Sequence, residues 1–406
     1  MRFLFVHQNF PGQYKHLAPA LAGRGHDVVA LAAQQAAAQT SIRTLRYKYE
    51  LKEPDRSVFR YATDMASRLQ RAEVVAGVAL QMREKMNYVP DVVCGHIGWG
   101  ETFFLKEIWP EARHVLYAEF FYGTRGKDVD FDPEYQKLEF PTRLNVVTRT
   151  AGLLLPLSTA DDVLAPTRWQ ARSFPPQWRD RIEVIHDGVD TKTVSPLDTA
   201  SVDFGGGVPV LRAGEEILTF VNRNLEPYRG YHVFMRALPK VLAARPNARV
   251  VVVGGDSVSY GQRAPGGQSW KEIILAEVRD RLDMSRVHFV GRVPYDKFVN
   301  LMRVSRVHAY LTYPFVLSWS MLEAMSAGAL VVGSRTPPVE EIIEDGANGL
   351  LVDFFDVDRW SETLIETLAR PDKFRHLREA ARRNIVERYD LASVCLPKTL
   401  QFVERK

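Results

Sequence analysis

The amino-acid sequence predicts an α/β protein made of two consecutive, Rossmann-like, doubly wound domains. Short apolar runs alternate with amphipathic stretches of helical periodicity along the chain, and this alternation is interrupted at Asp190–Gly214 and then restarts. Polar or glycine-rich turns follow several of the apolar runs. Because strands that alternate with helices form a parallel sheet covered on both faces, we expect one such sheet in each half of the chain.

The length and composition agree with this interpretation. The chain has 406 residues, which suggests two or three domains at roughly 100–200 residues each. Hydrophobic residues make up 46% of the chain and charged residues 25%, so either half is able to bury a core of its own. We predict an N-terminal domain at residues 1–195 and a C-terminal domain at residues 210–385.

The first domain opens with a continuous apolar run that reads as a buried strand, followed by a helix with Leu17 and Leu21 on one face. We predict that helix at Gln13–Arg24 and strands at Arg2–Val6, Asp27–Ala32, Asp91–Cys94, His114–Ala118, Val163–Ala165 and Glu183–Ile185.

The interruption contains Pro196, the triplet Gly205–Gly207 and Pro209, and we interpret it as a linker or an excursion at the sheet edge. After it we predict strands at Ile217–Val221, Arg249–Val253, Val287–Val290, Val307–Leu311 and Leu330–Gly333. The predicted helices are Tyr231–Ala244, Trp270–Leu282, Ser320–Ala327, Val357–Leu368 and Lys373–Arg388. The aperiodic segment Ser257–Ser269 is either a functional loop or a tolerated insertion.

Charge and cysteine content exclude several classes of protein. The net charge is +4 without dense runs of Lys or Arg, which argues against nucleic-acid binding. A solvated surface, attraction to an anionic membrane and attraction to phosphorylated ligands all fit this charge. The two cysteines suggest neither a disulfide framework nor a zinc cluster. Without a signal-peptide core or a long apolar stretch, we expect a cytoplasmic protein whose membrane contact is peripheral, at the inner face.

Ligands of open α/β sheets bind beyond the carboxyl ends of the strands, so residues just after the predicted strands are the first candidates. Gly12 follows the first strand, where a tight turn before a helix lets backbone N–H groups approach an anion. Simple turn geometry is an equally good explanation of this glycine. The sequence around it is not G-x-G-x-x-G, which disfavours a dinucleotide site and a dehydrogenase.

Two segments of the second half also follow strands. Arg223 and Arg229 flank a turn beside a helix N-terminus, and guanidinium groups match phosphate oxygens, although two surface arginines would look the same. Further on, Ser318 or Ser320 is expected to cap a helix whose free N–H groups hold phosphate. Glu323 is expected in the first turn of that helix, where it binds a ligand or only complements the helix dipole.

Read together, these segments resemble family 4 glycosyltransferases of the GT-B fold. The matching residues are Arg223 and Arg229, the block Pro314–Gly328 and the block Val184–Asp190. The opening Val6–Tyr14 resembles one bacterial subgroup of the family. The resemblance covers nearly the whole chain, and it implies that the two domains face a central cleft. It also implies that a C-terminal helix at about residues 386–406 crosses back to the first domain.

The family assigns a role to each matching residue. In the second domain, Arg223 and Arg229 would bind the diphosphate, with Arg229 standing where the family usually has Lys, and Glu323 would bind the ribose hydroxyls. The remaining donor contacts would come from Gly291, Arg292 and Val293 near the base, and from Leu317, Ser318, Trp319 and Ser320 near the diphosphate and sugar.

In the first domain, the resemblance places His96 near the transferring sugar. It places Glu119 at the acceptor side, where Tyr122 is a further candidate for stacking on sugar or base. The alternatives are a packed core histidine and ordinary aromatic packing. Asp91, Asp161 and Asp162 form no recognisable metal motif, so we predict no metal and no cofactor other than the co-substrate.

One position departs from the family pattern. The first glutamate of the family's Glu-x7-Glu element would fall at Phe315. A double displacement through a carboxylate there is therefore excluded. The resemblance implies same-face attack with the leaving phosphate as base, which needs leaving-group stabilisation and positioning.

The predicted function is a retaining hexosyl transfer from a UDP-, GDP- or ADP-sugar to a hydroxyl acceptor. By family precedent the acceptor is a glycan or lipid-linked molecule of cell-envelope or exopolysaccharide synthesis. Two alternatives remain. One is a sugar phosphorylase on the same scaffold. The other is a catalytically degenerate nucleotide-sugar-binding protein, which the loss of the glutamate at Phe315 keeps open.

Overall fold

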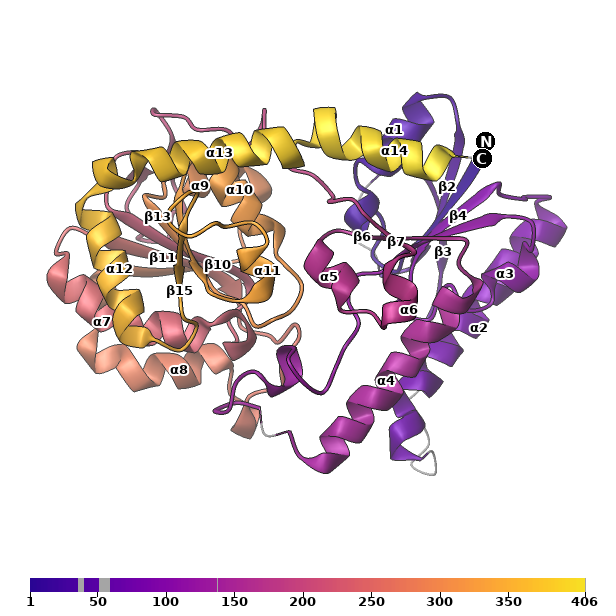
Figure 1. Ribbon diagram of the computed structural model, residues 1–406, viewed down its shortest axis with the longest axis horizontal. Helices are drawn as coiled ribbons and strands as arrows, with labels where there is room; N and C mark the ends of the chain where they lie inside the picture. The colour runs from indigo at the N-terminus through magenta and orange to yellow at the C-terminus, as the bar shows by residue number, and fades with distance from the viewer. Residues whose placement is uncertain (36–39, 51–58, 137, 406) are drawn as a thin grey trace. The chain divides into compact units, whose positions relative to one another are not determined.

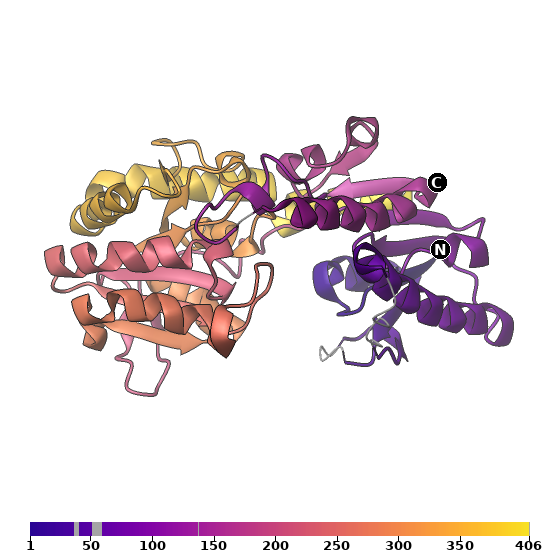
Figure 2. The same ribbon diagram turned by 90° about the horizontal axis from the view of Figure 1, so that it is seen from below.

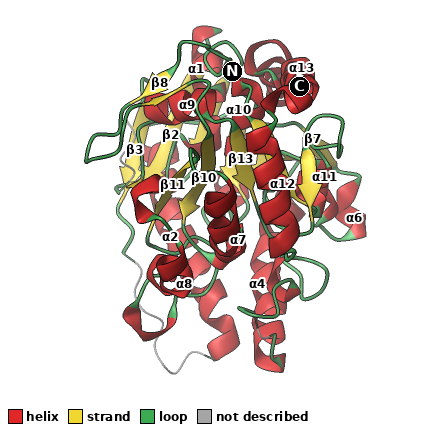
Figure 3. Cartoon of the chain, turned by 90° about the vertical axis from the view of Figure 1, so that its left-hand side faces the viewer, coloured by secondary structure: helices red, strands yellow, loops and turns green. Residues whose placement is uncertain are grey.

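The computed structural model describes residues 1–35, 40–50, 59–136 and 138–405. The chain divides into two compact units (Figure 1). The first unit combines Met1–Asp187 with Cys395–Lys406, and the second is Gly188–Val394. In both units strands alternate with helices, drawn yellow and red in Figure 3. The predicted fold class, two consecutive doubly wound α/β domains, is therefore confirmed.

The first unit contains a seven-stranded parallel sheet in the order β3-β2-β1-β4-β5-β6-β7. Side chains alternate along β1, so that Phe3 and Phe5 pack into one apolar cluster and Leu4 and Val6 into another. Full burial of side chains of this size contributes roughly 1.5–3 kcal/mol each. The strands are β1 (Arg2–Val6), β2 (Asp27–Ala33), β3 (Arg43–Tyr47), β4 (Val92–His96), β5 (Arg113–Tyr117), β6 (Asp162–Ala165) and β7 (Ile182–Val184).

The helices of the first unit include two long ones, α2 and α4, which pack against each other. The predicted helix Gln13–Arg24 is wrong in its first turns. A short 3-10 helix, Gly12–Tyr14, precedes α1, because the Tyr14 backbone N–H donates to the carbonyl of Pro11 three residues earlier (2.8 Å). The helices are α1 (Leu17–Gly23), α2 (Thr63–Lys85), α3 (Leu105–Ile108), α4 (Phe140–Thr159), α5 (Arg168–Arg172), α6 (Pro176–Arg179) and α14 (Leu396–Glu404).

The second unit contains a six-stranded parallel sheet in the order β12-β11-β10-β13-β14-β15. The predicted interruption holds a small antiparallel hairpin of β8 (Ser201–Val202) and β9 (Leu211–Arg212). The sheet strands are β10 (Ile217–Asn224), β11 (Arg249–Gly255), β12 (Val287–Gly291), β13 (Val307–Tyr310), β14 (Leu330–Ser334) and β15 (Leu350–Val352). Because β10 runs past the predicted end, Arg223 lies on the strand itself.

The helices of the second unit follow the sequence prediction closely at α7, whose bounds are as predicted. The predicted helix Trp270–Leu282 ends early, because the chain turns into a 3-10 helix at Arg279–Arg281. The helices are α7 (Tyr231–Ala244), α8 (Trp270–Val278), α9 (Tyr295–Val304), α10 (Trp319–Ala327), α11 (Pro337–Glu340), α12 (Val357–Ala369) and α13 (Arg375–Tyr389).

The end of the described chain returns to its start within the first unit (Figures 1 and 2). His26 Nε2 lies 2.8 Å from Glu404 Oε1. On the other side of α14, the Arg113 guanidinium donates hydrogen bonds to the backbone carbonyls of Phe402 (2.6 Å) and Val403 (3.0 Å). These contacts fix α14 to the first sheet.

Candidate functional site

Strand order marks one place in each unit where a ligand is expected. In a doubly wound sheet, ligands bind outside the carboxyl ends of the two strands at which the order reverses. In the first unit these strands are β1 and β4, and in the second they are β10 and β13. His7 follows β1 and His96 ends β4, while Arg223 lies near the end of β10 and Phe315 follows β13. Both points therefore hold residues with side chains suited to ligand binding.

The end of β10 and the turn that follows it place two arginines in different surroundings. Arg223 is exposed, and Arg229 is 6% exposed at the end of a 3-10 helix, Pro227–Arg229. Gly230 follows with a φ of +70° as the N-cap of α7, and an added Cβ there would lie 2.3 Å from Leu311 Cβ. A glycine is therefore required for the turn to approach β13 this closely.

The buried guanidinium of Arg229 organises the loop after β13. Its Nη1 donates hydrogen bonds to Thr312 Oγ1 (2.7 Å) and to the carbonyl of Val316 (2.9 Å). Its Cζ lies 5.2 Å from the ring centre of Tyr260 and 5.8 Å from that of Phe315. Burial lowers the pKa of Arg229, but the surrounding tyrosines raise it by more than burial lowers it. The guanidinium therefore stays charged.

Sequence reasoning missed Glu226, which is fully buried beside this turn. Its carboxylate accepts hydrogen bonds from the backbone N–H groups of Ser259 (3.0 Å), Tyr260 (3.4 Å) and Gly261 (3.0 Å). Glu226 thereby fixes the loop that brings Tyr260 over Arg229. The aperiodic loop was visible in the sequence, but nothing there showed which buried carboxylate would hold it.

The segment predicted to contact the base lies next to the same turn. Gly291 ends β12 with a φ of +65°, and an added Cβ there would meet open space. Arg292 Nη2 donates to Asn224 Oδ1 (3.1 Å), and Asn224 Nδ2 donates to Ser259 Oγ (2.6 Å). Val293 packs against the apolar core. The segment Gly291–Val293 is thus tied to the end of β10.

The loop before α10 presents the start of that helix. The Ser318 backbone N–H donates to Tyr310 Oη (2.8 Å), and the hydroxyls of Ser318 and Ser320 lie 3.0 Å apart. Ser318 occupies the N-cap position, but its side chain makes no capping hydrogen bond to the helix. Trp319 is 39% exposed. The predicted side-chain cap is therefore wrong, because the two hydroxyls bond to each other.

Glu323 is the fifth residue of α10, so its predicted place in the first turn is also wrong, because the helix begins at Trp319. The helix dipole is weaker at this distance from the helix end. The carboxylate is held instead by Tyr295, the first residue of α9, whose hydroxyl donates to Glu323 Oε1 (2.7 Å). Tyr295 was not predicted from the sequence.

In the first unit, aromatic rings surround the two histidines. His96 stacks on Trp99 with ring centres 4.0 Å apart, and His7 meets the same Trp99 edge-on at 4.7 Å. The backbone N–H of Gly98 donates to His96 Nδ1 (2.9 Å). Burial, together with the nearby His96, lowers the pKa of His7 to about 3, so His7 is neutral at physiological pH. Gly12 lies directly over its ring, where an added Cβ would be 2.5 Å from His7 Cε1.

The predicted acceptor-side residues lie in the same unit. Glu119 Oε2 is 3.6 Å from His96 Nε2, and the two side chains form an ion pair when the histidine is protonated. Tyr122 lies under Arg149 of α4, whose Cζ is 4.0 Å from the ring centre and whose Nη2 donates to the hydroxyl (3.2 Å). The structure thus brings His96 close to Glu119 and joins Tyr122 to α4.

No group of three or more His, Cys, Asp or Glu side chains within the described ranges is arranged to hold a metal ion. Metal independence stays a prediction.

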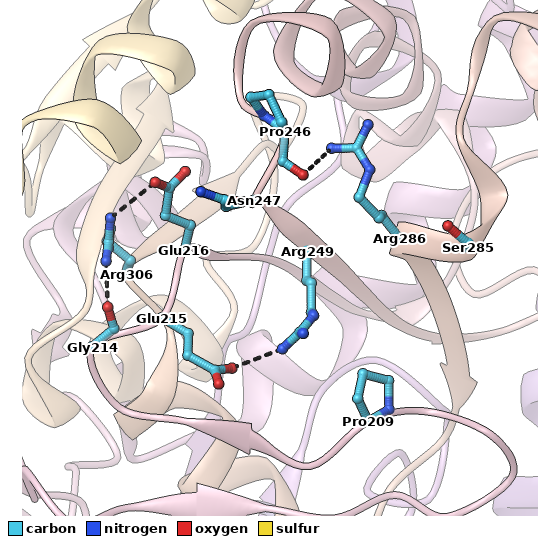
Figure 4. A pocket seen from close by; sticks show the side chains of 10 residues that line it. All are labelled: Pro209, Gly214, Glu215, Glu216, Pro246, Asn247, Arg249, Ser285, Arg286 and Arg306. Atoms are coloured by element: carbon cyan, nitrogen blue, oxygen red, sulfur yellow. Dashed lines mark hydrogen bonds and ion pairs between the residues drawn. The ribbon is translucent and has the colours of Figure 1, made fainter.

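A groove of about 620 Å³ lies at the opposite, amino end of the second sheet (Figure 4). Glu216 precedes β10, Arg286 precedes β12 and Arg306 precedes β13. Arg306 pairs with Glu216 (3.7 Å), and Arg286 donates to the carbonyl of Pro246 (3.2 Å). The groove contains none of the predicted site residues, and these arginines already have protein partners, so we assign it no ligand.

Comparison with protein families gives a match in each half of the chain. Residues 24–194 match the family model described as the glycosyl transferase family 4 group. Residues 208–384 match the model described as glycosyl transferases group 1. The second match contains β10–β15 and every second-domain residue singled out above.

Curated relatives share the name D-inositol 3-phosphate glycosyltransferase. The protein of Nocardia farcinica is 30% identical over 237 residues, which are 57% of this chain and 50% of the relative. The protein of Mycolicibacterium smegmatis is 29% identical over 228 residues, 55% of this chain and 48% of the relative. The chain thus spans about half the length of the curated relatives it matches.

Solved structures are similar over nearly the whole chain. Sucrose-phosphate synthase from Thermosynechococcus elongatus has a TM-score of 0.73 at 17% identity, covering 99% of this chain and 98% of the other. Anabaena Alr3699/HepE in complex with UDP-glucose has a TM-score of 0.66 at 17% identity, covering 99% and 100%. The TM-scores establish a shared fold, and at identities this low the similarity shows the fold alone.

Proposed function

Because the chain belongs to the family 4 glycosyltransferases of the GT-B type, we propose that it transfers a hexose from a nucleoside diphosphate-sugar to an acceptor hydroxyl with retention of anomeric configuration. The observation that carries this proposal is the position of Arg223. It lies exposed near the end of β10, at the strand-order reversal of the second sheet, and the turn that follows carries the buried cation Arg229. A diphosphate bound there would meet fixed positive charge as it departs.

The proposed donor is a UDP-, GDP- or ADP-sugar bound by the second unit. In this proposal Glu323 would accept hydrogen bonds from the ribose hydroxyls, and Gly291–Val293 would lie against the base. The start of α10 would add backbone N–H groups for the diphosphate. UDP-glucose, which is bound in the HepE structure, is the first donor to test.

The chemistry we propose is a same-face substitution. The bond between the anomeric carbon and the diphosphate oxygen breaks while the acceptor oxygen bonds to that carbon, and the acceptor proton passes to a phosphate oxygen of the leaving group. Arg223 would stabilise the departing charge, and Arg229 would hold the loop around it. Phe315 occupies the position of a family glutamate and has no group for covalent catalysis. The proposed reaction uses no metal ion.

The first unit would supply His96 to the transferring sugar and Glu119 and Tyr122 to the acceptor. The acceptor we propose is a glycan or lipid-linked hydroxyl of cell-envelope or exopolysaccharide synthesis. The name of the curated relatives adds D-inositol 3-phosphate to the acceptors to be tested.

Among the described residues, no helix combines the length and apolar character needed to cross a bilayer. We propose a peripheral contact with the inner face of the membrane through α4. Phe140 is 72% exposed and Val147 59% exposed on one face of this helix, with Leu155 two turns further on. The charged residues of α4 are Arg143 and Arg149, both basic. Arg143 lies near this apolar face and suits an anionic bilayer, whereas Arg149 lies on the other side of the helix and joins it to Tyr122.

The proposal is tested by incubating the protein with UDP-, GDP- and ADP-sugars and an acceptor panel, and by following nucleoside diphosphate release. Proton NMR of the product then gives the anomeric configuration. Retention supports the proposal, and inversion contradicts the same-face mechanism. Binding without turnover on a broad panel would favour the degenerate-binder alternative, which Phe315 keeps open. Phosphate-dependent cleavage of a disaccharide would favour the phosphorylase.

A further inference from the structure

The contact between α9 and α10 bears directly on the proposed donor site. Tyr295 Oη donates to Glu323 Oε1 at 2.7 Å, and the two residues lie on different helices. Glu323 is 9% exposed, whereas the Tyr295 ring is about half exposed. The hydroxyl of a half-exposed tyrosine therefore holds a mostly buried carboxylate.

The position of the Tyr295 hydroxyl is itself fixed by the core. The α9 helix buries Phe298, Val299 and Met302 in the apolar cluster of the second unit. The Tyr295 ring rests against Phe298 with ring centres 5.9 Å apart. Burial and the nearby Glu323 charge raise the pKa of Tyr295, so its hydroxyl remains a hydrogen-bond donor at physiological pH.

Tyr295 also stands next to the segment proposed to contact the base. It follows Gly291–Val293 after a single residue, Pro294. A nucleoside bound along this segment would carry its ribose toward α10. A free glutamate side chain samples several rotamers, and ordering it on binding costs conformational entropy. A carboxylate that is already oriented avoids most of this cost.

Phe315 makes this orientation matter more. Where the family has two glutamates, this chain has Glu323 alone at the donor site, and Phe315 packs instead against Tyr228 and Tyr260. At this position the loop after β13 therefore supplies an aromatic ring and no carboxylate. The Tyr295 hydroxyl donates a hydrogen bond to the Glu323 carboxylate.

We propose that Tyr295 is a positioning residue that presets the Glu323 carboxylate for the ribose hydroxyls and thereby makes the site select ribonucleoside over 2′-deoxyribonucleoside diphosphates. This inference rests on the proposed function, because it assumes that the second unit binds a nucleoside diphosphate. It assigns sugar selectivity to a pair of side chains on α9 and α10.

The test compares UDP with 2′-deoxy-UDP by isothermal titration calorimetry on the wild type and Tyr295→Phe, with GDP and ADP pairs run in parallel. The substitution removes the hydroxyl and keeps the ring. We expect the ribonucleotide to bind about 3- to 10-fold more weakly, the range for one lost hydrogen bond, with the deoxy form changed less than about 2-fold. The ratio of the two affinities therefore falls. Tyr49→Phe, which removes a hydroxyl bonded to Ser67 in the first unit, is the matched control and should leave the ratio unchanged.

A second comparison separates positioning from general structure. In the Glu323→Ala background, Tyr295→Phe should change ribonucleotide affinity no further, because the carboxylate it positions is gone. An equal loss for both sugar forms, an unchanged ratio, or a further loss in the Glu323→Ala background would each overturn the inference. Failure of the wild type to bind any nucleoside diphosphate would overturn the proposed function, and this inference with it.

Discussion

Arg229 Nη1 donates a 2.7 Å hydrogen bond to Thr312 Oγ1 and so joins the turn after β10 to the loop after β13. The two segments flank the place where strand order reverses in the second sheet. Arg229 is a buried cation whose hydrogen bonds go to protein acceptors, whereas the guanidinium of Arg223 is exposed to solvent. Arg229 therefore shapes the donor site, while exposed Arg223 is the arginine we expect to meet the diphosphate first.

Replacing Arg229 should impair folding stability as well as turnover. Arg229→Ala leaves Thr312 and the Val316 carbonyl without this donor, which costs about 2–4 kcal/mol at a buried site. At roughly 2–4 °C per kcal/mol for a domain of this size, Tm should fall by about 5–15 °C. Arg229→Lys keeps the charge but not the planar guanidinium, so its Tm should lie between those of the wild type and Arg229→Ala. An unchanged Tm in Arg229→Ala would show that these hydrogen bonds do not hold the loop.

Replacing Glu226 should release the loop that carries Tyr260. In Glu226→Gln the amide cannot accept all three backbone hydrogen bonds from Ser259–Gly261, so the segment should open more often. Limited trypsin digestion should then cut after Arg263 several times faster than in the wild type. Glu277→Gln, on α8 and paired with Arg236 of α7 rather than with this loop, serves as the control. Equal cleavage rates in Glu226→Gln and the wild type would contradict the anchoring role.

Much of this architecture was predictable from the sequence. Continuous apolar runs predict buried strands such as β1, and helical periodicity predicts α7. The positions of Arg223 and His96 near strand ends follow from the same pattern. The positions of Glu226 and Tyr295 were not predictable, because their partners lie in other elements and become neighbours only through packing.

The errors at α10 have the same origin. The sequence offers Ser318 and Ser320 as equivalent caps, and only the three-dimensional structure shows that their hydroxyls bond to each other. One residue's difference in the helix start then moves Glu323 beyond the first turn. Its contact with Tyr295, not the helix dipole, fixes the carboxylate.

Glu101 predicts a pH-dependent stability. Burial raises its pKa to about 7, although the hydrogen bond from the Tyr47 hydroxyl and the nearby Arg71 lower it in part. The folded-state pKa lies above the ordinary value of 4.5, so the folded protein favours the protonated carboxyl group. The contribution of protonated Glu101 to the free energy of unfolding is therefore full below about pH 4.5 and is lost as pH rises through about 7. Between pH 5 and 8, Tm of the wild type should fall more steeply than that of Glu101→Gln. Parallel curves would contradict this assignment.

The α4 surface predicts binding to anionic vesicles. The wild type should co-sediment with phosphatidylglycerol-rich vesicles, less with phosphatidylcholine alone, and less at high salt. Phe140→Ser combined with Val147→Ser should abolish most of this binding and leave nucleotide affinity intact. Val89→Ser removes an exposed apolar side chain of the same unit outside α4 and should have no effect. Binding unchanged by the double substitution would show that α4 is not the contact.

The most direct test of the proposed function is a thermal-shift screen against UDP, GDP, ADP, dTDP and their sugar conjugates, with NAD as control. A ligand at 100 times its Kd should stabilise the folded protein by about 2.7 kcal/mol, which gives a clear rise in Tm. We predict a rise with a ribonucleoside diphosphate that is lost in Arg223→Ala and Glu323→Ala. No rise with any of these nucleotides, or a rise with NAD alone, would contradict the assignment of a nucleotide-sugar site to the second unit.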